Sequence, residues 1–240
     1  MIDEFYKYVS NYDINDINIK LKYDHSIRVM ELCNRYSKLL GFSDEDIKLA
    51  TVIGLLHDIG RFEQLKVYNT FDDNKSIDHA LYGVNELFKK GIIKNFDCNK
   101  DDYEIIRFAI YNHNKIGIEN EIDERKIMHA KLIRDMDKID ILYLIAHYKN
   151  HKLLATDDPI TKEVSDSIYK HVQVEKNKRK NSNDKIVTML GFAFDINYDE
   201  CLKEFKSNIE YFYNTIDNKE KFKDIYNEVI KYIDERMRLC

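Results

Sequence analysis

Apolar residues recur every three or four positions along most of the chain, which is the period of an α-helix that buries one face. No stretch shows the strict alternation of a half-buried strand, and no internal repeat is detectable. The pattern predicts helices at about residues 25–40, 44–58, 78–90, 102–113, 122–148, 160–175, 199–216 and 219–238. Residues 62–77 and 174–186 lack this period, so we predict that both stretches are irregular.

The ends of these segments carry helix-terminus signals. Ser43 and Asp46 have the spacing of a capping box that opens the second predicted helix. Gly41 and Gly91 stand where a residue with left-handed backbone would end a helix. These signals support the predicted boundaries.

Composition narrows the fold class. The chain has 240 residues but only 7 glycines and 1 proline, whereas average usage would give roughly 17 and 12. Residues that form hairpins and tight turns are therefore scarce, which argues against a β-sandwich, barrel or propeller. We predict an all-α protein that forms a single helical domain, with a core at about 20–150 and a helical extension at 151–240 that is a candidate for substrate contact.

The net charge and the first residues of the chain indicate which partners and which cellular compartment to expect. The net charge of −5 offers no general attraction to nucleic-acid polymers or anionic membranes, and we interpret the basic run at 176–183 as a solvated surface loop. The first residues include Asp3 and Glu4 rather than a signal peptide, and no apolar run approaches the ~18 residues of a membrane-spanning helix. We therefore expect a cytoplasmic protein.

The four cysteines are scattered along the chain and include no C-x-x-C pair. We therefore interpret them as ordinary thiols: Cys33, Cys98, Cys201 and Cys240.

Four of the eight histidines align with apolar rows instead of charged faces, so their imidazoles are expected to point inward: His25, His57, His79 and His113. Two acids, Asp58 and Asp137, lie in equally apolar surroundings. Burying an ionised carboxylate costs several kcal/mol unless a cation or a donor network compensates. The combination therefore predicts a divalent metal site, and a ligand set without thiolate is compatible with Fe, Mn, Ni, Co, Zn or Mg.

These residues resemble the H…HD…D signature of the HD-domain superfamily of metal-dependent phosphohydrolases. The resemblance rests on His25, the run Gly54–Arg61 and the pair Asp137-Lys138, and it covers roughly residues 20–150. It implies an HD-type helical bundle in which one ion is held by His25, His57, Asp58 and Asp137.

Two further runs refine the resemblance. Residues 78–83 and 112–115 look like the extra histidines of HD proteins that hold two metal ions. This implies that Asp58 bridges the ions, while His79 and His113 complete the second position. The number of ions, one or two, stays open. Asp78 is our candidate for orienting an imidazole, and we interpret His129 as buried or hydrogen-bonded outside the ligand set.

A two-ion centre of this type implies phosphoryl chemistry, because adjacent cations lower the pKa of bound water and neutralise charge on a phosphoryl group. We expect a small phosphorylated substrate, a nucleotide. Arg61, Lys115 and Lys138 lie one to three residues from predicted ligands and are candidates to grip phosphate oxygens; a salt bridge to a nearby carboxylate is the alternative. The Gly-Tyr-Pro element of cyclic-dinucleotide phosphodiesterases is absent at 114–118, so cyclic di-GMP is not predicted.

Two other functions stay open at the level of sequence. A few HD proteins with the same ligands are di-iron oxygenases, and some relatives that have lost ligands serve only as regulatory or binding modules. Four of the seven glycines cluster near the predicted ligands: Gly54, Gly60, Gly83 and Gly117. Gly54 and Gly83 fall inside predicted helices, where each costs about 1 kcal/mol relative to Ala. We therefore expect close backbone approach or an open cavity at these positions.

Overall fold

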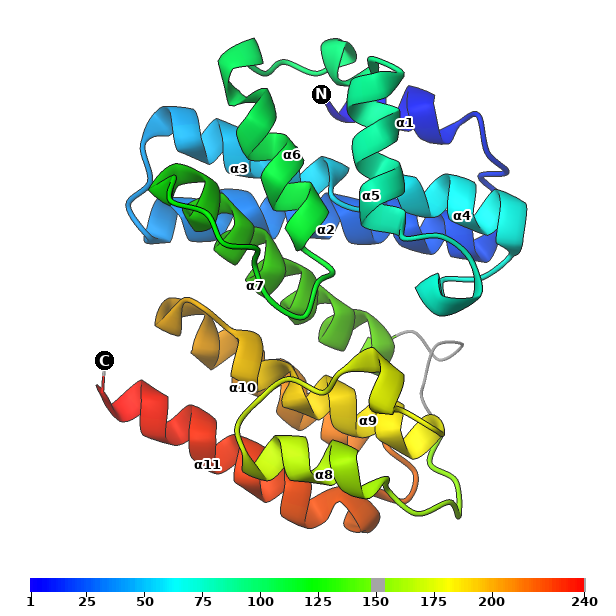
Figure 1. Ribbon diagram of the computed structural model, residues 1–240, viewed down its shortest axis with the longest axis vertical. Helices are drawn as coiled ribbons and strands as arrows, with labels where there is room; N and C mark the ends of the chain where they lie inside the picture. Colours follow the sequence, from blue (N-terminus) through cyan, green and yellow to red (C-terminus); the bar gives the residue numbers. More distant parts are fainter. Residues whose placement is uncertain (148–153, 240) are drawn as a thin grey trace. The chain divides into compact units, whose positions relative to one another are not determined.

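The computed structural model describes residues 1–147 and 154–239, and these residues form helices and connecting segments without a β-strand (Figure 1). The all-α prediction is confirmed. The α-helices are α1 (Ile2–Val9), α2 (Ile17–Leu39), α3 (Asp44–Leu56), α4 (Gly60–Tyr68), α5 (His79–Val84), α6 (Tyr103–Asn112), α7 (Glu124–His147), α8 (Lys162–Tyr169), α9 (Ser182–Leu190), α10 (Leu202–Asn214) and α11 (Lys223–Leu239). None of the described helices is long and apolar enough to cross a membrane.

The chain folds into two compact units, Met1–Asp137 and Lys138–Cys240. The division falls inside α7, so this one helix contributes residues to both units. The boundary predicted near residue 150 lies outside the described residues.

The first unit is built around α2 and α3, which pack against each other. Ser43 caps α3 by accepting a hydrogen bond from the amide of Asp46, and Gly41 has the expected left-handed backbone, with φ of 72°. Gly54 permits the close approach of the two helices, because a Cβ at this position would lie 2.9 Å from both Cys33 Sγ and the Cα of Met30. Close packing is thus the reason for this glycine.

A second close contact joins α4 to α5. A Cβ on Gly60 would lie 2.2 Å from the carbonyl oxygen of His79 and 2.7 Å from the amide nitrogen of Gly83. The two glycines therefore allow α5 to begin directly beside the start of α4. By contrast, a Cβ on Gly117 would meet nothing within 4 Å, so no close contact requires glycine there.

Several predicted boundaries were wrong. Residues 60–68 form α4 instead of a loop, and Asn69 ends this helix with left-handed backbone at φ of 50°. The short helices α1 and α9 were not predicted, and the helix expected at 160–175 ends at Tyr169, with left-handed backbone at His171. In each case the helix is short, so the apolar period extends over too few residues to be recognised.

The second unit comprises the end of α7 together with α8 to α11, and α11 packs against α8, α9 and α10. Asn181 and Asp184 form a capping box that starts α9 at Ser182, within the last residues of the basic run. Lys176 and Lys180 within that run are exposed, as expected for a surface loop. Cys33, Cys98 and Cys201 form no disulfide, and Cys240 lies outside the described residues.

Candidate metal centre

Helices α2 to α7 bring the six predicted ligands together. His25 lies in the middle of α2 and Asp137 lies on α7, whereas His57 and Asp58 form the turn between α3 and α4. His79 is the first residue of α5, and His113 follows the last residue of α6. The four histidines are buried, as their place in the apolar pattern predicts.

The six side chains form two groups that share Asp58. Asp58 Oδ2 lies 3.5 Å from His25 Nε2 and 3.6 Å from His57 Nε2. The other oxygen, Oδ1, lies 3.2 Å from His79 Nε2 and 3.5 Å from His113 Nε2. Each oxygen of one carboxylate therefore faces a different pair of imidazoles, which is the arrangement of a bridging ligand.

Asp137 belongs to the first group only. Its Oδ1 lies 3.2 Å from His25 Nε2 and 3.4 Å from His57 Nε2. Its side chain is 13% exposed, whereas those of His25 and His57 are fully buried. Asp137 is therefore the more accessible ligand of this group.

Two of the imidazoles are oriented by a backbone carbonyl so that Nε2 carries the lone pair. His57 Nδ1 donates to the carbonyl of Gly54 at 2.8 Å, and His113 Nδ1 donates to that of Ile110 at 2.6 Å. A carbonyl only accepts, so the proton is on Nδ1 and Nε2 is bare in the neutral ring. Burial lowers the pKa of His113 to about 4, which keeps this ring neutral at neutral pH.

This arrangement fits divalent metal ions. The Nε2 atoms of His25 and His57 are 3.2 Å apart, and those of His79 and His113 are 3.0 Å apart. Bare lone pairs that converge on each other and on carboxylate oxygens repel unless a cation lies among them. Neighbouring ligands of an octahedral ion with bonds of about 2.1 Å lie about 3 Å apart, which matches these separations. The donor set has the chemistry and the spacing that one or two divalent ions require.

A carboxylate from the loop before α5 fixes the orientation of His79. Both carboxylate oxygens of Asp73 lie 2.9 Å from His79 Nδ1. Burial alone would raise the pKa of Asp73, but the hydrogen bond from His79 and the charge of Arg61 outweigh it and hold the pKa well below its usual range. A carboxylate in this position keeps the ring in one tautomer and makes its Nε2 a better ligand.

The sequence prediction for this role was wrong. Asp78 does not orient His79; its side chain caps α5 and pairs with Lys115 Nζ at 2.6 Å. Asp73 precedes His79 by six residues in an irregular segment, so no helical spacing in the sequence indicates it.

Lys22 also belongs to the centre and was missed by the sequence analysis. Its Nζ lies 2.6 Å from Asp58 Oδ2. Burial would raise the pKa of Asp58, but the charge of Lys22 and the neighbouring imidazoles outweigh it and hold the pKa well below its usual range. Lys22 lies three residues before His25 on α2, so the two side chains share one face of this helix. This spacing is the feature of the sequence that could have identified Lys22.

The predicted phosphate-gripping residues have different surroundings. Arg61 donates to Asp73 Oδ1 at 2.9 Å and to the carbonyl of Phe71 at 2.7 Å, and its Nε lies 3.5 Å from Asp58 Oδ1. Gln64 is fully buried and also donates to Asp73 Oδ1, at 2.9 Å. Arg61 and Gln64 therefore fasten the loop that carries Asp73.

The two lysines each pair with an aspartate. The ammonium of Lys115 lies over the ring of Tyr111 at 4.4 Å, besides its contact with Asp78. Lys138 belongs to the second unit, where it is buried and pairs with Asp195 Oδ2 at 2.5 Å. Lys115 therefore contacts Asp78, the residue directly before His79, whereas the partner of Lys138 lies in the second unit.

A buried arginine secures the turn that follows His113. Arg134, 1% exposed, lies on α7 one turn before Asp137. Its guanidinium donates to the carbonyl of Asn112 at 2.6 Å and to that of Lys115 at 2.8 Å. The helix that supplies Asp137 therefore also fixes the backbone on both sides of His113.

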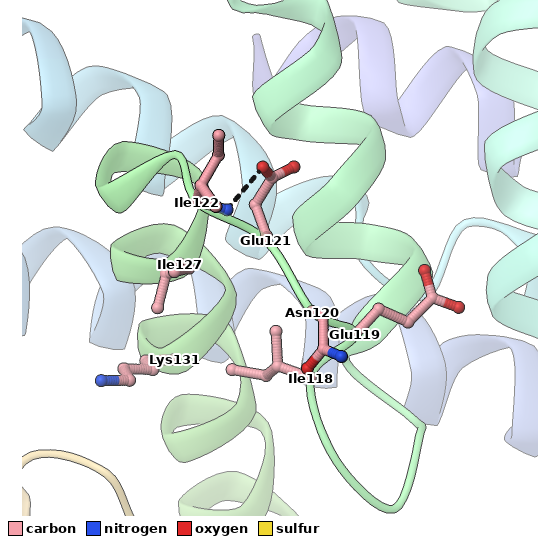
Figure 2. Close-up of a pocket in the computed structure, with 7 residues that line it drawn as sticks. All are labelled: Ile118, Glu119, Asn120, Glu121, Ile122, Ile127 and Lys131. Atoms are coloured by element: carbon pink, nitrogen blue, oxygen red, sulfur yellow. Dashed lines mark hydrogen bonds between the residues drawn. The ribbon is translucent and has the colours of Figure 1, made fainter.

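Other candidate features lie apart from the centre. His129 pairs with Asp46 Oδ1 at 3.0 Å at the other end of α7, in agreement with a role outside the ligand set. A surface hollow is lined by residues 118–122 with Ile127 and Lys131, and it contains none of the six ligands (Figure 2). Its two glutamates and its isoleucine side chains do not suit a phosphate group.

The HD domain family matches the chain over residues 23–142, which is half of its length. The chain belongs to the HD domain family. The matched HD domain contains all six side chains of the metal centre. Membership places the protein in a superfamily of metal-dependent hydrolases. No curated protein and no solved structure matches the chain.

Proposed function

We propose that this HD domain protein is a phosphohydrolase that cleaves a phosphate ester or anhydride of a small molecule, a nucleotide. The observation that carries the proposal is the position of Asp58, whose two oxygens face two separate pairs of imidazoles. A carboxylate shared in this way suits a pair of divalent ions. When bound, such ions lower the pKa of coordinated water and neutralise phosphoryl charge.

The chain's own residues supply the remaining requirements. His25, His57 and Asp137 would hold one ion, and His79 and His113 the other. Arg61 and Lys115 stand beside the second pair, where a guanidinium and an ammonium can bind phosphate oxygens. Arg61 Nε is buried without a hydrogen bond and lies 3.5 Å from Asp58 Oδ1, so the guanidinium charge is close to the shared carboxylate. Lys138, the third basic candidate, pairs with Asp195 and is not assigned a contact with the substrate in this proposal.

These basic residues favour phosphate chemistry over the di-iron oxygenase alternative. An oxygenase requires redox-active iron at both positions, whereas a hydrolase also works with redox-inert ions. Activity that is equal with iron and with magnesium or zinc excludes the oxygenase, and oxygen consumption that depends on iron and substrate contradicts our proposal.

The test is release of inorganic phosphate by the full chain after it has been loaded separately with Mg²⁺, Mn²⁺, Zn²⁺ or Fe²⁺. Nucleoside monophosphates, nucleoside triphosphates and p-nitrophenyl phosphate are the substrates. We expect turnover with at least one ion and a loss of at least about 100-fold in Asp58→Ala. Asp101→Ala, which removes an exposed carboxylate, is the matched control and should leave turnover unchanged. If the loaded protein turns over none of these substrates, the proposal is wrong.

A further inference from the structure

Three basic side chains lie at or beside the metal centre, and each pairs closely with a carboxylate; Arg61 also lies 3.5 Å from Asp58. Lys22 pairs with Asp58 at 2.6 Å, Arg61 with Asp73 at 2.9 Å, and Lys115 with Asp78 at 2.6 Å. The chain thus offsets three carboxylates of this set with its own cations, and Asp137 is the fourth. If two divalent ions are bound by the six ligands, this set has a surplus of positive charge that one singly charged anion does not balance.

Lys22 is one of the more accessible side chains at the metal centre. Its side chain is 12% exposed, close to the 13% of Asp137 and the 14% of Arg61, whereas the four ligand histidines are 0–2% exposed. The ammonium group has three donors. One donates to Asp58 Oδ2, so two are left for oxygen atoms of a ligand.

Lys22 and Arg61 both lie over the aromatic ring of Phe71. Lys22 Nζ lies 5.3 Å and Arg61 Cζ lies 5.8 Å from the centre of the Phe71 ring. An apolar ring beside two cations excludes water, which strengthens their attraction to an anion. Lys22, Arg61 and the Phe71 ring thus form a compact basic subsite next to Asp58.

We propose that Lys22 binds the substrate directly and, together with Arg61, selects phosphate groups that carry two or more negative charges. The terminal phosphate of a monoester or a polyphosphate has this charge, whereas a phosphodiester has a single one. The attraction between an ammonium and a dianion is about twice that to a monoanion at the same distance. This inference rests on the proposed function and specifies its substrate class.

The test measures binding by calorimetry instead of turnover. The full, metal-loaded chain is titrated with inorganic phosphate at about pH 8, where phosphate is mainly a dianion, and with dimethyl phosphate, which is a monoanionic diester. We expect phosphate to bind at least about tenfold more tightly than dimethyl phosphate. Lys22→Met should weaken phosphate binding about tenfold and dimethyl phosphate binding less than about threefold.

Three controls separate substrate binding from a structural role. Lys20→Met removes an exposed lysine two residues away on α2 and should change neither affinity. Lys22→Arg should recover part of the phosphate binding. Metal content is measured in every variant, and Lys22→Met should bind metal as well as or better than the parent, because it removes a positive charge beside Asp58. Loss of metal and of phosphate together in Lys22→Met would contradict the inference.

The result also distinguishes this inference from the proposed function. Turnover of phosphate esters with normal phosphate binding in Lys22→Met overturns the inference and leaves the function intact. Phosphate binding that depends on Lys22, without turnover of any ester or anhydride, supports the inference and overturns only the function.

Discussion

Asp73 accepts the Nδ1 proton of His79 between its two carboxylate oxygens, each 2.9 Å from the nitrogen. Asp73→Asn keeps the shape of the side chain but removes its charge. We expect the affinity for the ion at His79 and His113 to fall about 10–100-fold, as for other carboxylates that orient a metal-bound imidazole. Metal titration followed by calorimetry measures this. Asp78→Asn is the comparison, and an equal or larger loss in that variant would contradict the role of Asp73.

The two pairs of imidazoles should bind metal separately. His79→Ala leaves His25, His57, Asp58 and Asp137 in place, so we expect it to retain one ion per chain and to lose the other. Elemental analysis after dialysis counts the ions. His147→Ala, on the exposed part of α7 in the second unit, is the control and should retain the parent content. Loss of all metal in His79→Ala would show that the ions are not held as two groups.

The contact between α4 and α5 should not tolerate a methyl group. Gly60→Ala places a Cβ 2.2 Å from the carbonyl oxygen of His79, so the helices must separate. We expect the free energy of unfolding to fall by about 1–3 kcal/mol, and metal affinity at His79 to decrease as well. Chemical denaturation measures the first effect. Gly117→Ala meets nothing within 4 Å and should be close to neutral. A similar loss there would mean that the clash with His79 is not the cause.

A cluster away from the metal predicts how stability depends on pH. Burial would raise the pKa of Asp46, but hydrogen bonds from His129, Ser43 and Arg125 outweigh it and lower the pKa to about 2. Because the pKa is lower in the folded state, the contribution is full above about pH 4 and is lost as the pH falls towards 2.

Asp46→Asn should therefore lower the free energy of unfolding by about 1 kcal/mol at neutral pH, and this difference should shrink as the pH falls from 4 to 2. Urea denaturation of both proteins across this range measures it. Asp44→Asn, an exposed change in the same turn of α3, should not reproduce the pH dependence. A difference that stays constant with pH would mean that the charge of Asp46 is not what stabilises the fold.

Helical period allowed the inward-facing histidines to be predicted, because each lies on a row of apolar residues. His25, His57 and His79 are indeed buried. Lys22 was missed because the predicted helix began at about residue 25, whereas α2 begins at Ile17 and places Lys22 one turn before His25. The apolar pattern did not predict α4, because the fully buried Gln64 places a polar residue on the inward face of this helix.

Contacts between distant segments could not be predicted from period alone. Asp73 lies in an irregular segment, and its direction depends on hydrogen bonds from Arg61 and Gln64. The partner of Lys138 is Asp195, which is 57 residues away in sequence. Such pairings depend on how helices pack, and a single sequence contains no local signal for them.

The segment from His57 to Gln64 combines several of the features described above within eight residues. It supplies an imidazole, the shared carboxylate, the glycine that touches α5, and the two side chains that fasten the Asp73 loop. Inserting one residue here would turn every later side chain by about 100° around α4. We therefore expect that this segment does not tolerate an insertion or deletion. The loop at 117–122 should tolerate one, because a Cβ at Gly117 would meet nothing within 4 Å.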